Sequence, residues 1–232
     1  NFFDSKKVLN DLDTKGYSSI FRIDKEKVNS FSNTILDSKF LDAQKTSNLS
    51  VEQTTKKKSE ANEHYFSRMQ KLNLSRITGP VNLLNDNKIS EFICSKTMLR
   101  LAKDYLNSNS ISVSASYFIS FPSSLSETEK IKNAQYYHWD NDFVKFFKLY
   151  LYLSDVDSDS GPHIFIPETH KKKLYKHKLQ RAYKDSDINS SYEKKKEFLG
   201  EKGSFFFVDS YGLHKGEIPK KNYRLMINVH YG

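Results

Sequence analysis

The feature that most constrains the fold is a change in hydrophobic period near residue 110. Between Asp86 and Leu106, apolar residues recur at the spacing of an amphipathic helix. From Ile111 to Phe121, apolar residues alternate mainly with serines, and this period of two is typical of a strand with one apolar face. Strand patterns dominate beyond this point. The sequence therefore predicts a helical part, about 1–110, followed by a sheet-forming part, about 111–232.

Six strands are predicted in the second part, over Ile111–Phe121, Gln135–Trp139, Val144–Leu153, His163–Pro167, Gly203–Ser210 and Tyr223–His230. Two apolar runs, Phe143–Leu153 and Phe205–Val208, are nearly continuous, which predicts strands covered on both faces. A double-stranded β-helix, the jelly roll of cupin-like proteins, meets these requirements. We expect a mainly β fold with flanking helices, in which N-terminal helices buttress the barrel of a single domain over 1–232.

The first part opens with a helix, a strand and two further helices, predicted over Phe2–Leu12, Tyr17–Ile23, Lys25–Leu36 and Asp86 to about Leu106. Asp4 or Ser5 can cap the first helix, and Asp24 can cap the second. The intervening segment, 38–71, is polar and rich in lysine. It predicts a loop with an exposed helix, a candidate lid over an active site.

The formal net charge of +9 is concentrated in one segment. Between Lys171 and Glu197 there are ten Lys or Arg and four Asp or Glu residues, a net charge of +6. Charge runs usually mark solvated faces, so a basic helical insertion over about 171–200 is the simpler interpretation. The functional alternative is a flank that attracts an anionic substrate.

Composition limits the compartment and the partners. The single Cys94 cannot form an internal disulfide. No run of about 18 apolar residues is present, and the sequence begins without a signal-peptide pattern. These features predict a cytoplasmic protein without a membrane partner, and they say nothing about oligomeric state.

His138-Trp139-Asp140 is the first candidate for a chemical site. The two polar residues are two positions apart at a strand, so both side chains point to one face. His214 is the candidate third ligand because it follows a strand and a tight Tyr211-Gly212 step. Two histidines and one carboxylate leave three metal positions open, which suits non-haem Fe(II) that activates O2.

Arg224 lies ten residues after His214, on the strand that returns from the Pro219 turn. A hairpin of that length would place its guanidinium beside the metal, where it can pair with the far carboxylate of 2-oxoglutarate. An arginine on a strand is more often a salt-bridge partner, and Arg224 becomes informative only together with His138, Asp140 and His214 in this order.

Three sequence blocks resemble the phytanoyl-CoA dioxygenase family of Fe(II)/2-oxoglutarate-dependent oxygenases. They are His138-Trp139-Asp140, the stretch Leu153–Lys171 with its Ser160-Gly161-Pro162 and Ile166-Pro167, and the stretch Gly203–His214 followed by Arg224. Glu168 and Thr169 replace the Gly-Ser that is usual in the family, a departure that bears on substrate class rather than on the iron site.

The resemblance implies that His138, Asp140 and His214 bind Fe(II) and that Arg224 binds the C5 carboxylate of 2-oxoglutarate. The enzyme would use O2 to oxidise a small molecule, with release of succinate and CO2. Related halogenases lack the carboxylate at the position of Asp140, so hydroxylation, or else desaturation or ring closure, is expected. The substrate is expected to be small, with an anionic or carrier-linked one mildly favoured, and to be selected by segments 40–75 and 171–200.

The remaining polar candidates have simpler interpretations. His64 and His177 are expected at the surface, His170 as a structural residue, and His163 and His230 either lining the barrel or satisfied in the core. Asp142 is best interpreted as a solvated loop acid, although it could substitute as a ligand or contact substrate. Trp139 points away from the ligands and is expected to pack.

Two other classes of function remain open at this stage. One is a metal-binding cupin-like protein that performs no oxidation. The presence of Arg224 disfavours this alternative. The other is a basic nucleic-acid-binding module, which would need aromatic residues on an exposed, charged sheet. The aromatic residues fall instead in runs that predict burial, so nucleic acid is an unlikely partner.

Overall fold

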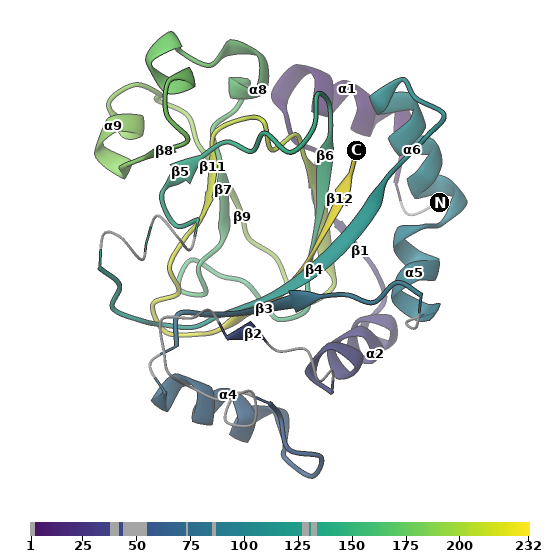
Figure 1. The fold of residues 1–232 in the computed structure, drawn as a ribbon, viewed down its shortest axis with the longest axis vertical. Coiled ribbons are helices and arrows are strands. Elements are labelled where there is room, and N and C mark those ends of the chain that lie inside the picture. Colours follow the sequence, from purple (N-terminus) through teal and green to yellow (C-terminus); the bar gives the residue numbers. More distant parts are fainter. Residues whose placement is uncertain are drawn as a thin grey trace.

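The computed structural model describes residues 3–37, 42–43, 55–72, 74–84, 87–126, 130 and 134–232. Two antiparallel sheets face each other, with helices on the outer side of the larger one (Figure 1). The larger sheet has seven strands in the order β1-β10-β6-β12-β4-β3-β2, and the smaller has five in the order β8-β5-β11-β7-β9. This is the predicted jelly roll buttressed by N-terminal helices.

The strands of the larger sheet, in spatial order, are β1 Phe21–Arg22, β10 Ser204–Val208, β6 Phe147–Tyr152, β12 Arg224–Tyr231, β4 Val113–Ser120, β3 Arg76–Pro80 and β2 Asp42–Ala43. Those of the smaller sheet are β8 Ala182–Tyr183, β5 Tyr137–His138, β11 His214–Gly216, β7 His163–Phe165 and β9 Lys196–Phe198.

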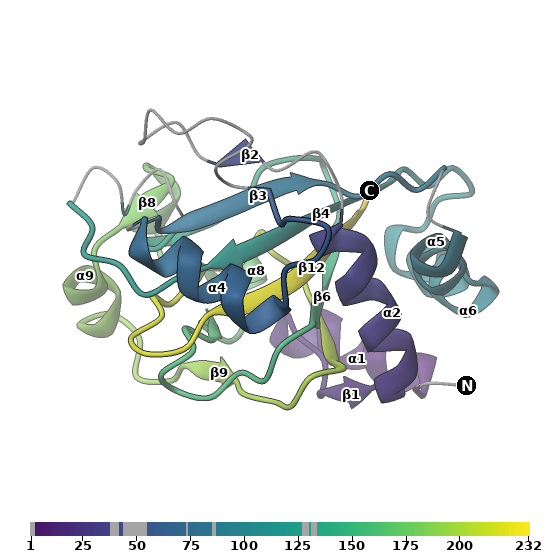
Figure 2. The ribbon, with the colours of Figure 1, turned by 90° about the horizontal axis from the view of Figure 1, so that it is seen from below.

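Four helices cover the outer face of the larger sheet, α1 Ser5–Lys15, α2 Lys25–Leu36, α5 Asn87–Ile93 and α6 Lys96–Leu106 (Figures 1 and 2). Their apolar stripes join one core cluster with the outward residues of the sheet, such as Leu149 and Ile227. Asp4 accepts hydrogen bonds from the first turn of α1, and Asp24 from that of α2, as the sequence predicts. Among the described helices, none is long and apolar enough to cross a membrane.

The continuous apolar runs are explained by cover on both faces. On β6, Leu149 and Leu151 pack toward the helices, whereas Tyr150 and Tyr152 belong to a second cluster between the sheets. Successive strand residues point to opposite faces, so a strand that is buried on both sides needs apolar residues at most positions. One inward residue of this strand, Lys148, is charged and also buried.

Two predictions about the helical part need correction. The helix expected over Asp86–Leu106 is two helices, because Ser95 accepts from the N–H of Met98 and caps α6 as a new start. Helix α4, Asn62–Lys71, is not simply exposed, since Phe66 is buried and stacks on Tyr223 with ring centroids 3.7 Å apart. Most of the rest of the predicted lid, 38–41 and 44–54, lies outside the described residues.

The basic segment also differs from the predicted helical insertion. It contains short helices, α8 Thr169–Lys172 and α9 Asp185–Asn189, a 3-10 turn η1 Tyr175–Lys178, and the edge strands β8 and β9. Lys173 is buried and donates to the carbonyl oxygens of Thr169 and Tyr211. His177, predicted at the surface, is only 2% exposed and contacts Tyr192. The segment therefore completes the smaller sheet, so its charge pattern was a poor guide to burial.

The predicted hairpin between His214 and Arg224 is wrong. Strand β11 belongs to the smaller sheet and β12 to the larger one, so the Pro219 turn crosses from one sheet to the other. The crossing still brings the two residues to the same interior, because the sheets face each other.

Candidate metal centre

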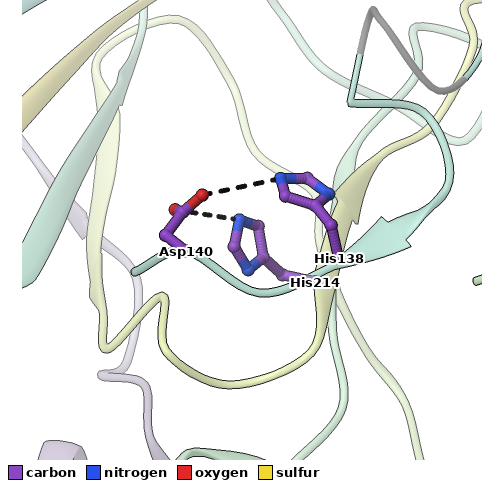
Figure 3. A group of neighbouring side chains, drawn as sticks. All are labelled: His138, Asp140 and His214. Carbon is purple, nitrogen blue, oxygen red and sulfur yellow. Dashed lines mark ion pairs between the residues drawn. The ribbon is translucent and has the colours of Figure 1, made fainter. Parts of the chain in front are cut away.

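The two candidate histidines lie opposite each other on paired strands. His138 of β5 is the register partner of His214 of β11, and Asp140 follows β5 by two residues (Figure 3). The His214 Nε2 atom lies 3.4 Å and the His138 Nε2 atom 3.9 Å from the nearest oxygen of Asp140. One candidate ligand atom from each residue lies within 4.8 Å of the others. Three donors that are distant in sequence therefore converge at one point.

Backbone carbonyls orient both imidazole rings. Nδ1 of His138 lies 2.9 Å from the carbonyl oxygen of Tyr136, and Nδ1 of His214 lies 2.9 Å from that of Gly212. A carbonyl oxygen only accepts, so each Nδ1 carries the proton and each Nε2 presents a lone pair toward Asp140. This tautomer is the one in which Nε2 can bind a metal.

The electrostatics of the group also favour a bound cation. Burial lowers the pKa of His138 to about 3, so its ring is neutral at physiological pH. Burial opposes ionisation of Asp140, but the hydrogen-bonded ammonium group of Lys148 favours the charged carboxylate, and the pKa of the carboxyl lies well below its usual value. Two imidazole nitrogens and one carboxylate fit the donor set of a non-haem Fe(II) site, and they leave coordination positions open.

The centre opens into a cavity of about 270 Å³ between the sheets. Arg224, the first residue of β12, lines the same cavity and is buried. Its Nη2 atom lies 3.4 Å from the hydroxyl of Ser120, while Nε and Nη1 have no hydrogen-bond partner among the residues that the structure describes. Buried guanidinium donors are normally paired, so the fork fits a carboxylate that enters the cavity.

Gly216 makes room for this guanidinium. A Cβ atom at this position, the end of β11, would lie 2.9 Å from Nη2 of Arg224. A larger residue at this position would therefore push the guanidinium aside.

Two cavity residues were missed by the sequence interpretation. Arg76 of β3 is the register partner of Ser120, and burial, together with the nearby Arg224, lowers its pKa to about 10. Lys148 donates to Asp140 at 2.7 Å and lies 3.1 Å from Asp142. A lysine inside the apolar run Phe143–Leu153 was a signal for an inward charge, whereas no strand was predicted at Arg76.

The other polar candidates take separate places. His163 lines the cavity, with its ring centroid 4.4 Å from that of Tyr150, so it lies inside the barrel. His170 is structural, as predicted, because its Nε2 bonds the carbonyl oxygen of Asp13. Trp139 packs against Tyr211 and donates to a backbone carbonyl. His64 is exposed, as predicted.

The sequence matches the phytanoyl-CoA dioxygenase (PhyH) family over residues 12–218. No curated protein matches it significantly. Among similar solved structures is HygX from Streptomyces hygroscopicus with nickel and 2-oxoglutarate bound, at a TM-score of 0.62 and 13% identity, covering 98% of this chain and 86% of that one. Another is the epimerase SnoN in complex with Fe3+, alpha ketoglutarate and nogalamycin RO, at 0.64 and 11% identity, covering 98% and 82%.

A third similar structure is the carbocyclase SnoK from nogalamycin biosynthesis, at a TM-score of 0.62 and 12% identity, with coverage of 97% of this chain and 83% of that one. At these identities the structural likeness establishes the fold, the jelly roll already described. The family match extends over most of the chain, from the end of α1 to the turn before β12. The chain therefore belongs to the phytanoyl-CoA dioxygenase family of Fe(II)- and 2-oxoglutarate-dependent oxygenases.

Proposed function

We propose that His138, Asp140 and His214 hold Fe(II), that Arg224 binds the C5 carboxylate of 2-oxoglutarate, and that the enzyme hydroxylates a small molecule. The observation that carries the proposal is one shared cavity. Two imidazole Nε2 atoms and a carboxylate converge at one side of it, and guanidinium donors without a partner among the described residues lie in the same space. A bidentate 2-oxo acid can bridge these two features.

Fe(II) and 2-oxoglutarate, when bound, would supply the oxidising chemistry, in which O2 is reduced and succinate and CO2 are released. The chain's own residues would bind and orient these groups, and they exclude water from the site. The carbonyls of Tyr136 and Gly212 fix the imidazole tautomers, and Lys148 holds one oxygen of Asp140. The two sheets enclose the reacting groups and limit access of solvent.

Hydroxylation is the proposed outcome because a carboxylate occupies position 140. Halogenases that resemble this family lack that carboxylate, so oxygen transfer is favoured here. The similar structures include an epimerase and a carbocyclase, so the product must be analysed for loss of hydrogen as well as gain of oxygen. HygX has also been crystallised with hygromycin B, which supports a small-molecule substrate for this chain. A cytoplasmic location, favoured by the free Cys94, stays part of the proposal.

Succinate release tests the proposal. Protein with Fe(II), ascorbate and 2-oxoglutarate should convert 2-oxoglutarate to succinate slowly without substrate, and His214→Ala should abolish the conversion. His64→Ala, at an exposed position, is the matched control and should retain it. No turnover under any condition, together with unchanged iron affinity in His214→Ala, would contradict the proposal. Iron binding without turnover would instead favour a non-oxidative metal-binding protein.

A further inference from the structure

The strand register orders the inward residues by depth. Along β12, Arg224, Met226, Asn228 and His230 lie opposite Ser120, Phe118, Ser116 and Ser114 of β4. On the other side, β6 sets Tyr150 opposite Asn228 and Lys148 opposite His230. Lys148 bonds Asp140, so the metal centre lies toward the Asn228 and His230 end, away from Arg224. A co-substrate that reaches from the metal to Arg224 leaves this other end free for substrate.

A second cavity occupies that end. Its volume is about 310 Å³, and it adjoins the first because Lys148 and Asn228 line both. Side chains at its rim are partly exposed, 42% for Asp142 and 47% for Phe143, so it opens to solvent. Its size is that of a small-ligand site.

Most of the described residues that line this second cavity carry a polar group. The described lining consists of hydroxyl, amide, imidazole, carboxylate and ammonium groups with one aromatic ring, from Ser114, Ser116, Asn228, His230, Asp142, Lys148 and Phe143. The ring of Phe143 stacks on that of His230 with centroids 5.0 Å apart, so the imidazole covers part of the Phe143 ring, and the exposed remainder of that ring is open to a ligand. An exposed aromatic ring beside hydrogen-bonding groups suits a ligand ring that has an apolar face and a hydroxylated edge.

Two polar atoms of this lining need partners. Oδ1 of Asn228 and Nε2 of His230 are buried, and neither has a hydrogen-bond partner within the described part of the chain. The Asn228 oxygen is an acceptor, so the missing partner is a donor such as a hydroxyl. The Asp142 carboxylate, 3.9 Å from His230, is a second acceptor at the rim.

An acyl chain would fit the lining of the second cavity poorly. Methylene groups would cover the Asn228 oxygen and the His230 nitrogen without bonding them, and an unpaired buried polar atom is costly. Among the described residues of the lining, Phe143 is the only large apolar one, so an acyl chain would contact few apolar side chains there. The lining therefore selects against the acyl group for which the family is named.

We propose that the substrate is a cyclic, hydroxyl-rich molecule of about monosaccharide size, held by Asn228, Ser116 and His230 through its hydroxyl groups and by Phe143 through one ring face. This inference rests on the proposed function, since it uses the metal centre to locate the reacting end of the substrate. It replaces the anionic or carrier-linked substrate that the lysine-rich segment suggested, because the cavity's own acceptors call for hydrogen-bond donors.

Calorimetric titration of the protein loaded with Ni(II) and 2-oxoglutarate tests the inference. The probes are glucose, glucosamine and myo-inositol, set against octanoate and octanoyl-CoA. At least one hydroxylated probe should bind, and Asn228→Leu should raise its Kd roughly ten-fold through loss of a hydrogen bond. Ser116→Ala is a gentler variant that should act in the same direction. Asn189→Leu, exposed in α9, is the matched control and should leave the Kd unchanged.

Two outcomes would overturn the inference. One is binding of octanoyl-CoA that Asn228→Leu leaves equal or strengthens. The other is the absence of binding by all three hydroxylated probes. Substrate-free succinate release from the same preparation separates the two proposals: if release occurs and these probes fail, only the substrate class is wrong, whereas absent release contradicts the proposed function itself.

Discussion

Lys148 contacts the candidate metal centre through Asp140, and its contribution to stability can be tested. Its ammonium group bonds Asp140 inside the barrel, so in the metal-free protein it is the cation that compensates a buried carboxylate. A metal ion would supply a second, stronger compensation. The contribution of Lys148 to stability should therefore depend on metal.

Lys148→Met should lower the free energy of unfolding of the metal-free protein by about 3 kcal/mol, because removal of one partner leaves a buried charge unpaired. Added Ni(II) should restore more stability to this variant than it adds to the wild type. Urea denaturation with and without Ni(II) measures both effects, and Lys178→Met at an exposed position is the control. An equal loss of stability in both conditions would show that Lys148 does not act through Asp140.

Glu60 gives a prediction about pH. The hydrogen-bonded Arg68 guanidinium lowers the pKa of Glu60 from 4.5 to about 2, and Arg68 belongs to α4. A carboxyl whose folded pKa is lowered stabilises the fold above its unfolded pKa and loses that contribution as pH falls toward its folded pKa. The window for the loss is therefore between pH 4.5 and about 2.

Glu60→Gln should accordingly destabilise the protein by about 1–2 kcal/mol near neutral pH, a value reduced for the partial exposure of the pair. The difference from wild type should shrink as the pH falls through that window. Denaturant titrations at a series of pH values give the comparison. A difference that stays constant with pH would mean that the pair contributes nothing through ionisation.

At the scale of elements, the crossing from β11 to β12 positions the guanidinium of Arg224. Gly216 ends β11, and a methyl group there would meet the guanidinium at 2.9 Å. Gly216→Ala should displace the fork by a few tenths of an ångström and weaken 2-oxoglutarate binding by roughly ten-fold, because bidentate pairing is sensitive to geometry. Iron affinity should be unchanged in the same variant. Parallel losses of iron and 2-oxoglutarate would indicate a general distortion of β11.

Elements with a clear period were predicted well from the sequence, and those stabilised by distant contacts were not. Helix α2 has its predicted bounds, because the Asp24 cap and its apolar spacing are local signals. Strand β3 was missed, since Gly79-Pro80 suggested a break and its partner, β4, lies about 40 residues away. For the same reason the segment after Lys171 was predicted to be exposed to solvent, although its edge strands β8 and β9 pair with β5 and β7.

The candidate site was accessible to sequence analysis where its residues form a compact motif. His138-x-Asp140 uses the two-residue period of a strand, so one stretch of sequence gives two side chains on one face. Arg76 and Asn228 carry no such local signal. They line the same cavity only because β3, β4 and β12 are neighbours in the sheet, and that order is a property of the whole fold.

For the whole molecule, the helices outside the larger sheet contribute stability and the space between the sheets contributes the chemistry. Leu101 of α6 is fully buried in the outer core and is not among the residues that line the cavity. Leu101→Ala should cost about 2–5 kcal/mol of stability through the cavity that it creates. The iron affinity of the folded protein should stay the same. A large fall in iron affinity would show that the outer core controls the geometry of the centre.

The central claim is that one cavity holds a metal through His138, Asp140 and His214 and a 2-oxo acid through Arg224. Anaerobic addition of Fe(II) and then 2-oxoglutarate tests it most directly, since chelation of Fe(II) by a 2-oxo acid gives a visible charge-transfer absorbance. The wild type should develop this band, His214→Ala should lose it, and Arg224→Ala should bind iron but need much more 2-oxoglutarate. Absence of the band in the wild type, or equal loss of iron and 2-oxoglutarate binding in Arg224→Ala, would contradict the account.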